Sequence, residues 1–333
     1  MIKNNLYLDL DNVISDSDKV VRSLIRKHLK ITAGKKDITN FNYWEALGFD
    51  KKLEEPIWTE FHDSSCFLAN PIESSIDALR RISLYTNIHI LTSRKESSKE
   101  ITYKWLKKYR IPHSTLEFVD ESDKINLVLN SKNKLLVEDR GETVEYIANT
   151  GKKVILFDNP WNKKFKHKNI IRLKNWPSIY LYISKFECYG KSLYELHKIL
   201  FEKAIGALQN SYSPYSKYKV GAAIMTIYGN IFTGCNIENV AFSPTICAER
   251  TAIFKAVSEG YKKGDFFAIS IASRNSIGKD DFATPCGVCR QVMIEFSDPS
   301  FPLQISTRDN KKGLNIRSIN DYLPNSFGEF NKI

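Results

Sequence analysis

The hydrophobic and polar positions in the first half of the chain follow two alternating patterns. Short apolar runs predict strands, and stretches in which apolar residues recur every three or four positions predict helices. The predicted strands are 5–10, 88–91, 116–119, 135–138 and 154–157, and the predicted helices include 17–30, 74–83 and 98–108. Strands that alternate with helices over short links favour an α/β fold with a doubly wound parallel sheet, covered on both faces.

A different order of elements begins near residue 190. A helix is predicted over 193–208, and apolar strands over 220–226 and 231–235 flank a Tyr-Gly-Asn turn, which is typical of a hairpin. The remaining predicted elements are helices at 247–259 and 286–296 and strands at 267–273 and 303–307. The second half is therefore also expected to combine helices with a sheet.

Chain length and composition support two globular domains. At roughly 100–200 residues per domain, 333 residues favour two domains, and the change of pattern divides the chain into 1–189 and 190–333. The aromatic-rich segment 40–66 has weak periodicity, and we expect a small helical insertion there. A hydrophobic content of 42% with 26% charged residues excludes a disordered chain.

Charge and hydrophobic run lengths exclude several kinds of partner. No apolar run approaches the ~18 residues of a membrane span, and the start lacks the pattern of a signal peptide, so we expect a cytoplasmic protein without a membrane partner. The net charge is +11, yet no block of five or more like charges occurs. Nucleic-acid binders gather basic residues into a stripe or an arm. We therefore expect no nucleic-acid partner, and a basic surface that at most attracts small anionic substrates.

The cysteines point to a metal rather than to disulfides. Six cysteines in 333 residues, without an export signal, do not form a disulfide framework. Cys286 and Cys289 form a Cys-x2-Cys pair, which in a reducing compartment indicates a metal site or a redox dithiol. Cys247 lies in TICAER (245–250), at the start of one predicted helix, and the pair in TPCGVC (284–289) begins another.

Three thiolates at two helix starts suit a catalytic zinc ion. Three protein ligands leave one tetrahedral position open, and zinc in that state lowers the pKa of a bound water towards 7. Glu249 lies two residues after Cys247, where it is placed to move protons rather than to bind metal. A structural zinc with Cys235 as fourth ligand is one alternative. A redox Cys-x2-Cys is another, but it leaves Cys247 and Glu249 unexplained.

Residues 191–333 resemble the small cytidine deaminases that assemble as homotetramers. The matching stretches are SPYSKYKVGAA (213–223), GCNIENVAFSPTICAERTA (234–252), TPCGVCRQV (284–292) and LPNSF (323–327). The resemblance implies an α/β/α three-layer fold with a mixed sheet, and a homotetramer formed through this domain. It implies the following roles: zinc ligands Cys247, Cys286 and Cys289; proton shuttle Glu249; ribose partners Asn236 and Glu238; aromatic residues at the substrate Tyr218 and Phe327; and thiolate partner Arg250. Phe242 departs from the family pattern, because a tyrosine usually stands there and reaches a neighbouring subunit's site.

Polar groups also follow the predicted strands of the first half. Asp9 and Asp11 follow the first strand, in a spacing that suits Mg²⁺ and nucleophilic attack on phosphorus. LTSR (91–94) places hydroxyl groups after another strand, and LVEDR (136–140) places two acidic groups after a third. In α/β sheets this end of the strands is where ligands bind.

Residues 3–175 resemble haloacid-dehalogenase-like hydrolases, and within them the cytosolic pyrimidine 5′-nucleotidase type, including VILFDNPWN (154–162). The resemblance implies that the segment 40–66 is a cap over the site. It implies these roles: nucleophile Asp9; general acid/base Asp11; phosphate-binding residues Thr92 and Ser93; charge-stabilising Lys124, with Lys132 and Lys134 as alternatives; and magnesium ligands Asp9, Asp11, Glu138 and Asp139.

Together the two resemblances predict a bifunctional pyrimidine-salvage enzyme. The first domain would dephosphorylate a pyrimidine nucleoside 5′-monophosphate with Mg²⁺, and the second would deaminate cytidine and deoxycytidine with Zn²⁺. The expected partners are small-molecule nucleosides and nucleotides. Three alternatives stay open: a first domain that acts on another small phosphoester, a first domain that is only a scaffold, and a nucleic-acid deaminase. The second-domain motifs favour free nucleosides over the last of these.

Overall fold

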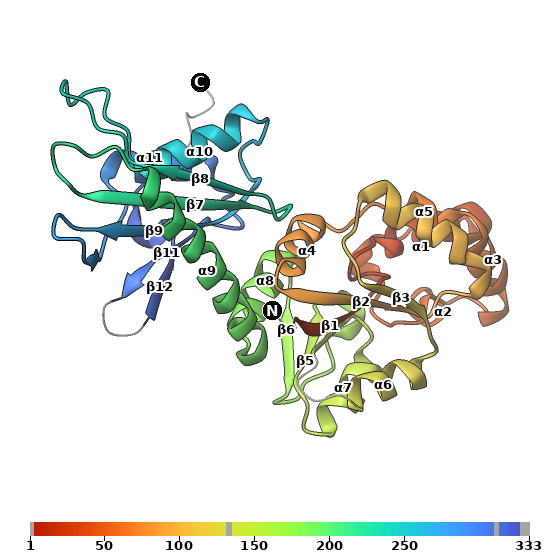
Figure 1. Cartoon of the computed structure of the whole chain (residues 1–333). Coiled ribbons are helices and arrows are strands. Elements are labelled where there is room, and N and C mark those ends of the chain that lie inside the picture. Colours follow the sequence, from red (N-terminus) through yellow and green to blue (C-terminus); the bar gives the residue numbers. More distant parts are fainter. Residues whose placement is uncertain (1–2, 131–134, 310–312, 327–333) are drawn as a thin grey trace. The chain divides into compact units, whose positions relative to one another are not determined.

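The chain forms two compact units, with the boundary between Gly190 and Lys191. The computed structural model describes residues 3–130, 135–309 and 313–326. Each unit has its own sheet and its own helices (Figure 1). The α/β fold predicted for each half is therefore confirmed, and the two units are described one at a time.

The first unit is built on a parallel sheet of six strands in the order β3-β2-β1-β4-β5-β6. Every neighbouring pair in it is parallel. The strands are β1 (Asn4–Asp9), β2 (Thr86–Thr92), β3 (Thr115–Phe118), β4 (Leu135–Glu138), β5 (Val154–Phe157) and β6 (Ile170–Leu173). The strand order reverses between β1 and β4, and ligands of such sheets bind at the carboxyl ends of the strands beside that reversal.

Helices cover both faces of this sheet, which confirms the doubly wound arrangement. Figure 1 shows α6 and α7 on one side of the sheet and α1 and α5 on the other. The helices of this layer structure are α1 (Ser17–Leu29), α4 (Ser75–Ser83), α5 (Lys99–Tyr109), α6 (Glu121–Leu129), α7 (Gly141–Asn149) and α8 (Trp176–Lys185). The strands β4 and β5 are buried along their whole length, as expected for a sheet covered on both faces.

The aromatic-rich insertion forms a small helical cap, as predicted. It contains α2 (Tyr43–Leu47), α3 (Glu54–Asp63) and short 3₁₀ turns. Ile57 and Phe61 of α3 pack with Val21 and Ile25 of α1 in one buried cluster. Burial of such side chains stabilises a fold by about 1.5–3 kcal/mol each, so the cap is held on the unit by its own apolar face.

The second unit contains a mixed sheet in the order β12-β11-β9-β7-β8, and the short β10 (Asp280–Asp281) pairs with β9. The pair β9–β11 is parallel, whereas β7–β8, β7–β9 and β11–β12 are antiparallel. The strands are β7 (Lys219–Thr226), β8 (Ile231–Cys235), β9 (Phe266–Arg274), β11 (Gln304–Asp309) and β12 (Gly313–Ser318). The helices are α9 (Glu187–Ala207), which begins before the boundary at Gly190 and continues into this unit, α10 (Ala248–Ser258), α11 (Gly287–Phe296) and α12 (Ile319–Tyr322).

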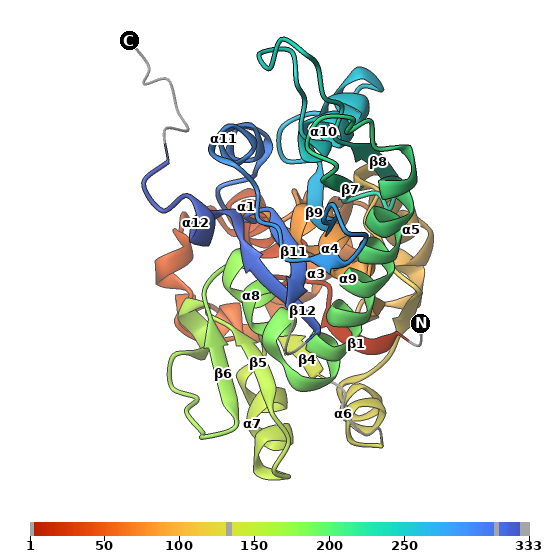
Figure 2. The ribbon, with the colours of Figure 1, turned by 60° about the vertical axis from the view of Figure 1, so that its left-hand side comes forward.

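Two glycines show that helices cover opposite faces of this sheet. A Cβ atom on Gly221 would lie 2.1 Å from the Ala204 carbonyl oxygen of α9, and one on Gly234 would lie 2.4 Å from the Ala252 nitrogen of α10. Gly234 pairs with Ala222, the residue after Gly221. Because successive strand residues point to opposite faces, α9 and α10 lie on opposite sides. The three-layer α/β/α arrangement is confirmed, and Figure 2 shows these layers from a second direction.

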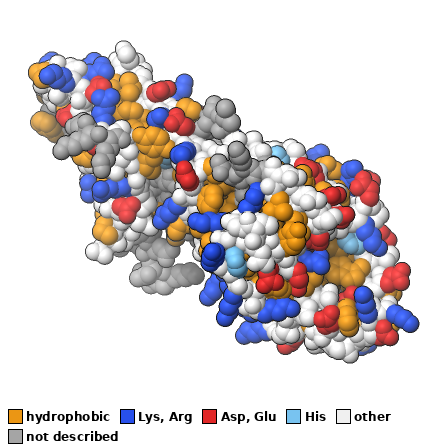
Figure 3. Space-filling view, turned by 90° about the horizontal axis from the view of Figure 1, so that it is seen from below, with side chains coloured by type: hydrophobic (Ala, Val, Ile, Leu, Met, Phe, Trp, Pro, Cys, Tyr) orange, Lys and Arg blue, Asp and Glu red, His pale blue; other side chains and the backbone are white. Residues whose placement is uncertain are grey.

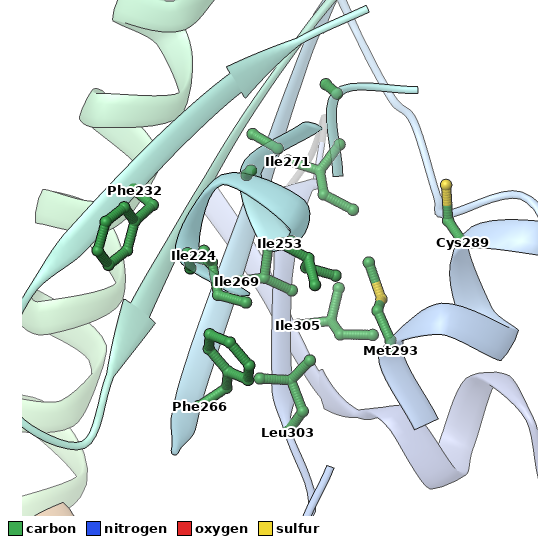
Figure 4. Close-up of a cluster of buried hydrophobic side chains, with 14 of the residues drawn as sticks. Ile224, Phe232, Ile253, Phe266, Ile269, Ile271, Cys289, Met293, Leu303 and Ile305 are labelled. Carbon is green, nitrogen blue, oxygen red and sulfur yellow. The ribbon is translucent and has the colours of Figure 1, made fainter. Parts of the chain in front are cut away.

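The core of the second unit lies between its sheet and the helices α10 and α11. Figure 4 shows Ile253 of α10 and Met293 of α11 meeting Ile269 and Ile305 of the sheet. Cys289 belongs to the same buried cluster, at its edge towards the start of α11. This cluster therefore fixes the starts of both helices, which carry the cysteine motifs.

A buried histidine predicts how the stability of the second unit depends on pH. His197 of α9 is fully buried, its Nε2 donates to Gln304 Oε1 at 2.8 Å, and burial lowers its pKa from 6.5 to about 4. As the pH falls, the histidine of the unfolded chain binds a proton near pH 6.5, whereas the buried histidine binds one only near pH 4. The neutral His197 therefore contributes its full share to the free energy of unfolding above pH 6.5, and this share is lost as the pH falls towards 4. We expect a loss of about 3 kcal/mol across that range. His197→Gln should flatten the pH dependence of unfolding measured by denaturant titration, and equal slopes for both proteins would contradict this prediction.

The face drawn in the space-filling view of Figure 3 carries mixed charges. On the face seen in Figure 3, Lys and Arg side chains lie interspersed with Asp and Glu rather than in a single stripe. Among the described residues, no helix is both long enough and apolar enough to cross a membrane.

Candidate active sites

The site of the first unit lies where β1, β2 and β4 end. Asp9 is the last residue of β1, Thr92 of β2 and Glu138 of β4, and Asp139 follows directly. A cavity of about 220 Å³ opens at this edge of the sheet, beside the reversal of strand order. Aromatic and imidazole side chains of the cap and one core tryptophan line the other side of the cavity: Phe41, Tyr43, Trp58, Phe61, His62 and Trp161.

Three buried carboxylates form a group that can hold a metal ion. One oxygen each of Asp9, Glu138 and Asp139 lies within 4.8 Å of the others. Burial, followed by the neighbouring charge of Glu138, raises the pKa of Asp9 and of Asp139 well above the usual value. A divalent cation would relieve this crowding of negative charge, and carboxylate oxygens are ligands that Mg²⁺ accepts.

Lys124 is the positive group in that cluster. Its Nζ donates to Asp9 at 2.8 Å and to Glu138 at 2.9 Å, and lies 3.3 Å from Glu121. Burial alone would lower the pKa of Lys124, but the attraction of these carboxylates outweighs burial and raises it. The ammonium group is therefore charged and lies beside Asp9. The alternative lysines, Lys132 and Lys134, fall outside the described residues.

Asp11 does not join the carboxylate group. Its oxygens face Arg94, with Nη2 at 2.6 Å and Nε at 2.9 Å, and they also accept from the Ser17 hydroxyl. Although burial opposes it, the Arg94 guanidinium lowers the pKa of Asp11. The Asp11 carboxylate lines the cavity as an ionised group, but the set that can hold an ion is Asp9, Glu138 and Asp139.

The two predicted phosphate-binding hydroxyls differ in position. Ser93 lines the cavity and donates to Glu121 at 2.9 Å. Thr92 is fully buried, accepts from the Arg94 backbone N–H at 3.3 Å, and is not part of the cavity wall among the described residues. Sequence reasoning did not identify Arg94 or Glu121. Arg94 is the last residue of the motif LTSR (91–94), and its place next to the predicted phosphate-binding hydroxyls could have drawn attention to it.

The site of the second unit joins the starts of two helices. Cys247 immediately precedes α10, Cys286 immediately precedes α11, and Cys289 lies in the first turn of α11. Their sulfur atoms all lie within 4.8 Å of one another, with Cys247 Sγ and Cys286 Sγ 3.8 Å apart. Cys235 lies outside this group, and its Sγ contacts the Asn210 carbonyl oxygen at 3.1 Å.

The local groups favour a thiolate and a proton carrier side by side. The hydrogen bond from Cys289, with further help from Arg250, lowers the pKa of Cys247 to about 5. Arg250 Nη2 lies 3.9 Å from Cys247 Sγ. Glu249, in the first turn of α10, is only 4% exposed, and burial raises its pKa to about 7. A carboxyl group with that pKa can both accept and donate a proton near neutral pH.

The predicted ribose partners follow β8. Glu238 accepts from the backbone N–H groups of Tyr215 at 2.9 Å and Ser216 at 3.3 Å, and from the Ser216 hydroxyl. The side chain of Asn236 is already hydrogen-bonded within the protein. Its Oδ1 accepts from the Val220 N–H at 2.8 Å, and its Nδ2 donates to the Tyr218 carbonyl at 2.9 Å. Asn236 thus holds the backbone on both sides of Lys219.

The predicted aromatic residues have different surroundings. Tyr218 is half-buried, and its hydroxyl donates to Asp281 at 3.3 Å. Phe242 is 84% exposed on the loop that precedes Cys247. Phe327 lies outside the described residues.

Two family models match the two units. Residues 3–187 match the cytosolic type C pyrimidine deoxy 5′-nucleotidase family, and residues 194–304 match the zinc-binding region of cytidine and deoxycytidylate deaminases. A nucleotidase of Clostridium acetobutylicum is 27% identical over 53% of this chain and 91% of its own length.

Relatives of the second unit are deaminases by name. A cytidine deaminase of Sporosarcina psychrophila is 41% identical over 37% of this chain and 85% of its own length. A probable cytidine deaminase of Dictyostelium discoideum is 54% identical over 29% of this chain, a match that spans 65% of that protein. The solved cytidine deaminase of Burkholderia pseudomallei is 40% identical, with a TM-score of 0.36, over 39% of this chain and 98% of that chain. This hydrolytic enzyme therefore belongs to two families, the cytosolic type C 5′-nucleotidases through its first unit and the cytidine deaminases through its second.

Proposed function

We propose that the chain is a bifunctional pyrimidine-salvage enzyme. Its second unit hydrolyses cytidine and deoxycytidine to uridine and deoxyuridine, and its first unit removes phosphate from pyrimidine nucleoside 5′-monophosphates. The main support for the deaminase assignment is that three cysteine sulfurs converge beside the buried Glu249. The aromatic-lined cavity over Asp9 and Lys124 supports a phosphatase for esters that carry a flat base.

The donor set of the second unit fits zinc. Three sulfur ligands with an open fourth position are typical of a catalytic zinc site, and one of the three thiols already has a strongly lowered pKa. Bound there by Cys247, Cys286 and Cys289, zinc would supply a water that is acidic enough to lose a proton near pH 7. Arg250 moderates the negative charge of the thiolates.

Glu249 performs the proton transfers of deamination. Replacement of the 4-amino group by oxygen consumes one water and releases one ammonia, so protons must move from the water to the substrate nitrogens. Glu249 accepts a proton from the water and delivers it to the ring, and it then carries another to the departing amino group. Asn236 and Glu238 contribute on the ribose side, Asn236 by fixing the backbone and Glu238 by its half-buried carboxylate.

The first unit is proposed to hydrolyse the phosphate ester by covalent catalysis. An Asp9 carboxylate oxygen attacks phosphorus, and the bond to the nucleoside O5′ breaks as O5′ takes up a proton from Asp11, the proposed general acid/base, which lines the same cavity. Water then hydrolyses the aspartyl phosphate and returns a proton to Asp11. Lys124 balances negative charge at Asp9 throughout. Asp9, Glu138 and Asp139 would hold Mg²⁺, which would neutralise phosphate charge when bound.

An exposed apolar loop supports a homotetramer formed by the second units. Ile237, Val240 and Phe242 on this loop are 43%, 75% and 84% exposed. Exposed apolar side chains in such number on a single loop mark an interaction surface. A mass corresponding to four chains in solution is the expected result.

A substrate panel tests the proposed function. CMP, dCMP, UMP, AMP, cytidine and deoxycytidine are each followed for phosphate and for ammonia. We expect phosphate from the pyrimidine monophosphates in the presence of Mg²⁺, and ammonia from the two nucleosides. Ammonia from neither nucleoside would overturn the deaminase, and phosphate from AMP or another ester alone would overturn the pyrimidine assignment.

Zinc removal is expected to abolish the deaminase activity and to leave the phosphatase activity unchanged. Chelation followed by restoration of Mg²⁺ should abolish ammonia release, because the three thiolates are the metal donors, and should leave phosphate release unchanged. Metal analysis should find about one zinc per chain before treatment. Cys289→Ser should lose zinc, whereas Cys188→Ser, outside the cysteine group, should retain it. Full ammonia release by zinc-free protein would contradict the prediction.

A further inference from the structure

Arg94 is a buried arginine at the edge of the phosphatase cavity with no role so far. It follows Thr92 and Ser93 in the loop after β2, and its side chain is only 1% exposed. Nε and Nη2 both bind Asp11, and Nη1 donates to Thr102 of α5 at 3.1 Å. The ring of Phe61 in the cap lies over the guanidinium at 5.6 Å. Arg94 is thus fixed by α5 and by the cap at the same time as it binds Asp11.

The hydrogen bonds distinguish the two oxygens of Asp11. Oδ1 accepts from Arg94 Nη2 at 2.6 Å and from the Ser17 hydroxyl, with Arg94 Nε also near at 3.2 Å. Oδ2 accepts only from Arg94 Nε, at 2.9 Å, among the described residues. A carboxylate oxygen has about two acceptor positions, so Oδ1 is saturated and Oδ2 keeps one. Because the guanidinium fork is planar and binds both oxygens, it fixes the rotation of the carboxylate.

We propose that Arg94 is a positioning residue that presents Asp11 Oδ2 to the water that hydrolyses the aspartyl phosphate. The inference rests on the phosphatase function proposed above. In this step the water oxygen bonds to phosphorus, and the bond between phosphorus and Asp9 breaks. Asp9 regains its carboxylate, one water proton passes to Asp11 Oδ2, and inorganic phosphate leaves. In this role Arg94 acts through the orientation of Asp11 and not on the phosphate itself.

The placement of Arg94 predicts which of the two steps fails without it. Attack by Asp9 on an ester whose leaving group needs no proton does not require Asp11. Hydrolysis of the aspartyl phosphate does require it, whatever ester was used. Loss of the fork should therefore let the first step proceed and slow the second, so that phosphorylated enzyme accumulates.

Rapid-quench kinetics of the full chain with p-nitrophenyl phosphate and Mg²⁺ test this inference. Arg94→Met is expected to release about one nitrophenolate per active site in a fast burst, and then to turn over tenfold to a hundredfold more slowly than wild type. Acid-quenched protein should carry phosphate on Asp9. A merely structural role would reduce the burst in proportion to the lost active protein. Turnover within twofold of wild type, or slow turnover without a burst, would overturn the inference.

Two further variants keep the result interpretable. Arg94→Lys keeps the charge but loses the planar fork, and it should show the same burst with a smaller fall in turnover even if Arg94→Met does not fold. Arg81→Met removes another buried arginine, in α4 and outside the cavity, and should turn over like wild type without a burst. If wild type itself releases neither phosphate nor nitrophenolate, the proposed phosphatase function fails. If wild type turns over normally but the Arg94 variants show no burst, only the role of Arg94 fails.

Discussion

Glu249→Gln is expected to reduce ammonia release from cytidine by a factor of about 10²–10⁴. Glutamine has nearly the same shape, so the 4% exposed position in α10 stays filled and the cysteine group next to it stays in place. The amide cannot take up a proton, which removes the path from water to the substrate nitrogens. The measurement is kcat for cytidine at equal zinc content, with phosphate release by the same protein as an internal reference.

Glu259→Gln provides the matched control for this result. Glu259 lies at the other end of α10 and is exposed to solvent. Its replacement should leave kcat within twofold of wild type, because the charge is far from the three cysteines along the helix. A Glu249→Gln protein that binds zinc and deaminates cytidine at more than a tenth of the wild-type rate would contradict the role of Glu249.

Asp9→Asn is expected to lower phosphate release by a factor of roughly 10³ or more, the scale of losses seen when a nucleophile is removed. An amide oxygen is too weak a nucleophile to form the acyl phosphate. The substitution also removes one of three crowded carboxylates, so we expect no loss of thermal stability. Phosphate release from CMP and ammonia release from cytidine are measured together, and only the first should fall.

Asp123→Asn is the control for the nucleophile. Asp123 is an exposed residue of α6, one position before Lys124. Asp123 is next to Lys124 in the sequence but does not line the cavity, so this variant should keep full phosphate release. An Asp9→Asn protein with more than a tenth of the wild-type phosphatase rate would show that another group attacks phosphorus.

The sequence allowed most of the fold to be predicted because strand and helix periods differ clearly. Two elements of the first unit were missed, β6 and α8. All four residues of β6, Ile170–Leu173, are only partly buried, because β6 is an edge strand of the sheet. A four-residue run at an edge carries little hydrophobic signal. The start of α8 depends on Asn175, whose side chain accepts from the Ser178 N–H, a capping contact that went unrecognised.

The sequence predicted which groups lie close together where their positions follow from the ends of strands and helices, but it did not predict which way individual side chains turn. The cysteines converge because each motif begins a helix, and Asp9 and Glu138 meet because neighbouring parallel strands end together. The pairing of Asp11 with Arg94 spans 83 residues and is decided by rotamers. The order of motifs therefore did not show that Asp11 turns away from the other carboxylates. The internal contacts of Asn236 were hidden for the same reason.

The central place of β1 has a consequence for synthesis on the ribosome. β1 is made before both of its neighbours, β2, which begins at Thr86, and β4, which begins at Leu135. At about 5–20 residues per second, roughly ten seconds separate the emergence of β1 from that of β4. During that interval the nascent chain exposes the apolar segment Leu6–Leu8, which the finished unit buries almost completely. Shielding by ribosome-associated chaperones would therefore matter most for the segment that becomes β1, in the interval before β4 has emerged.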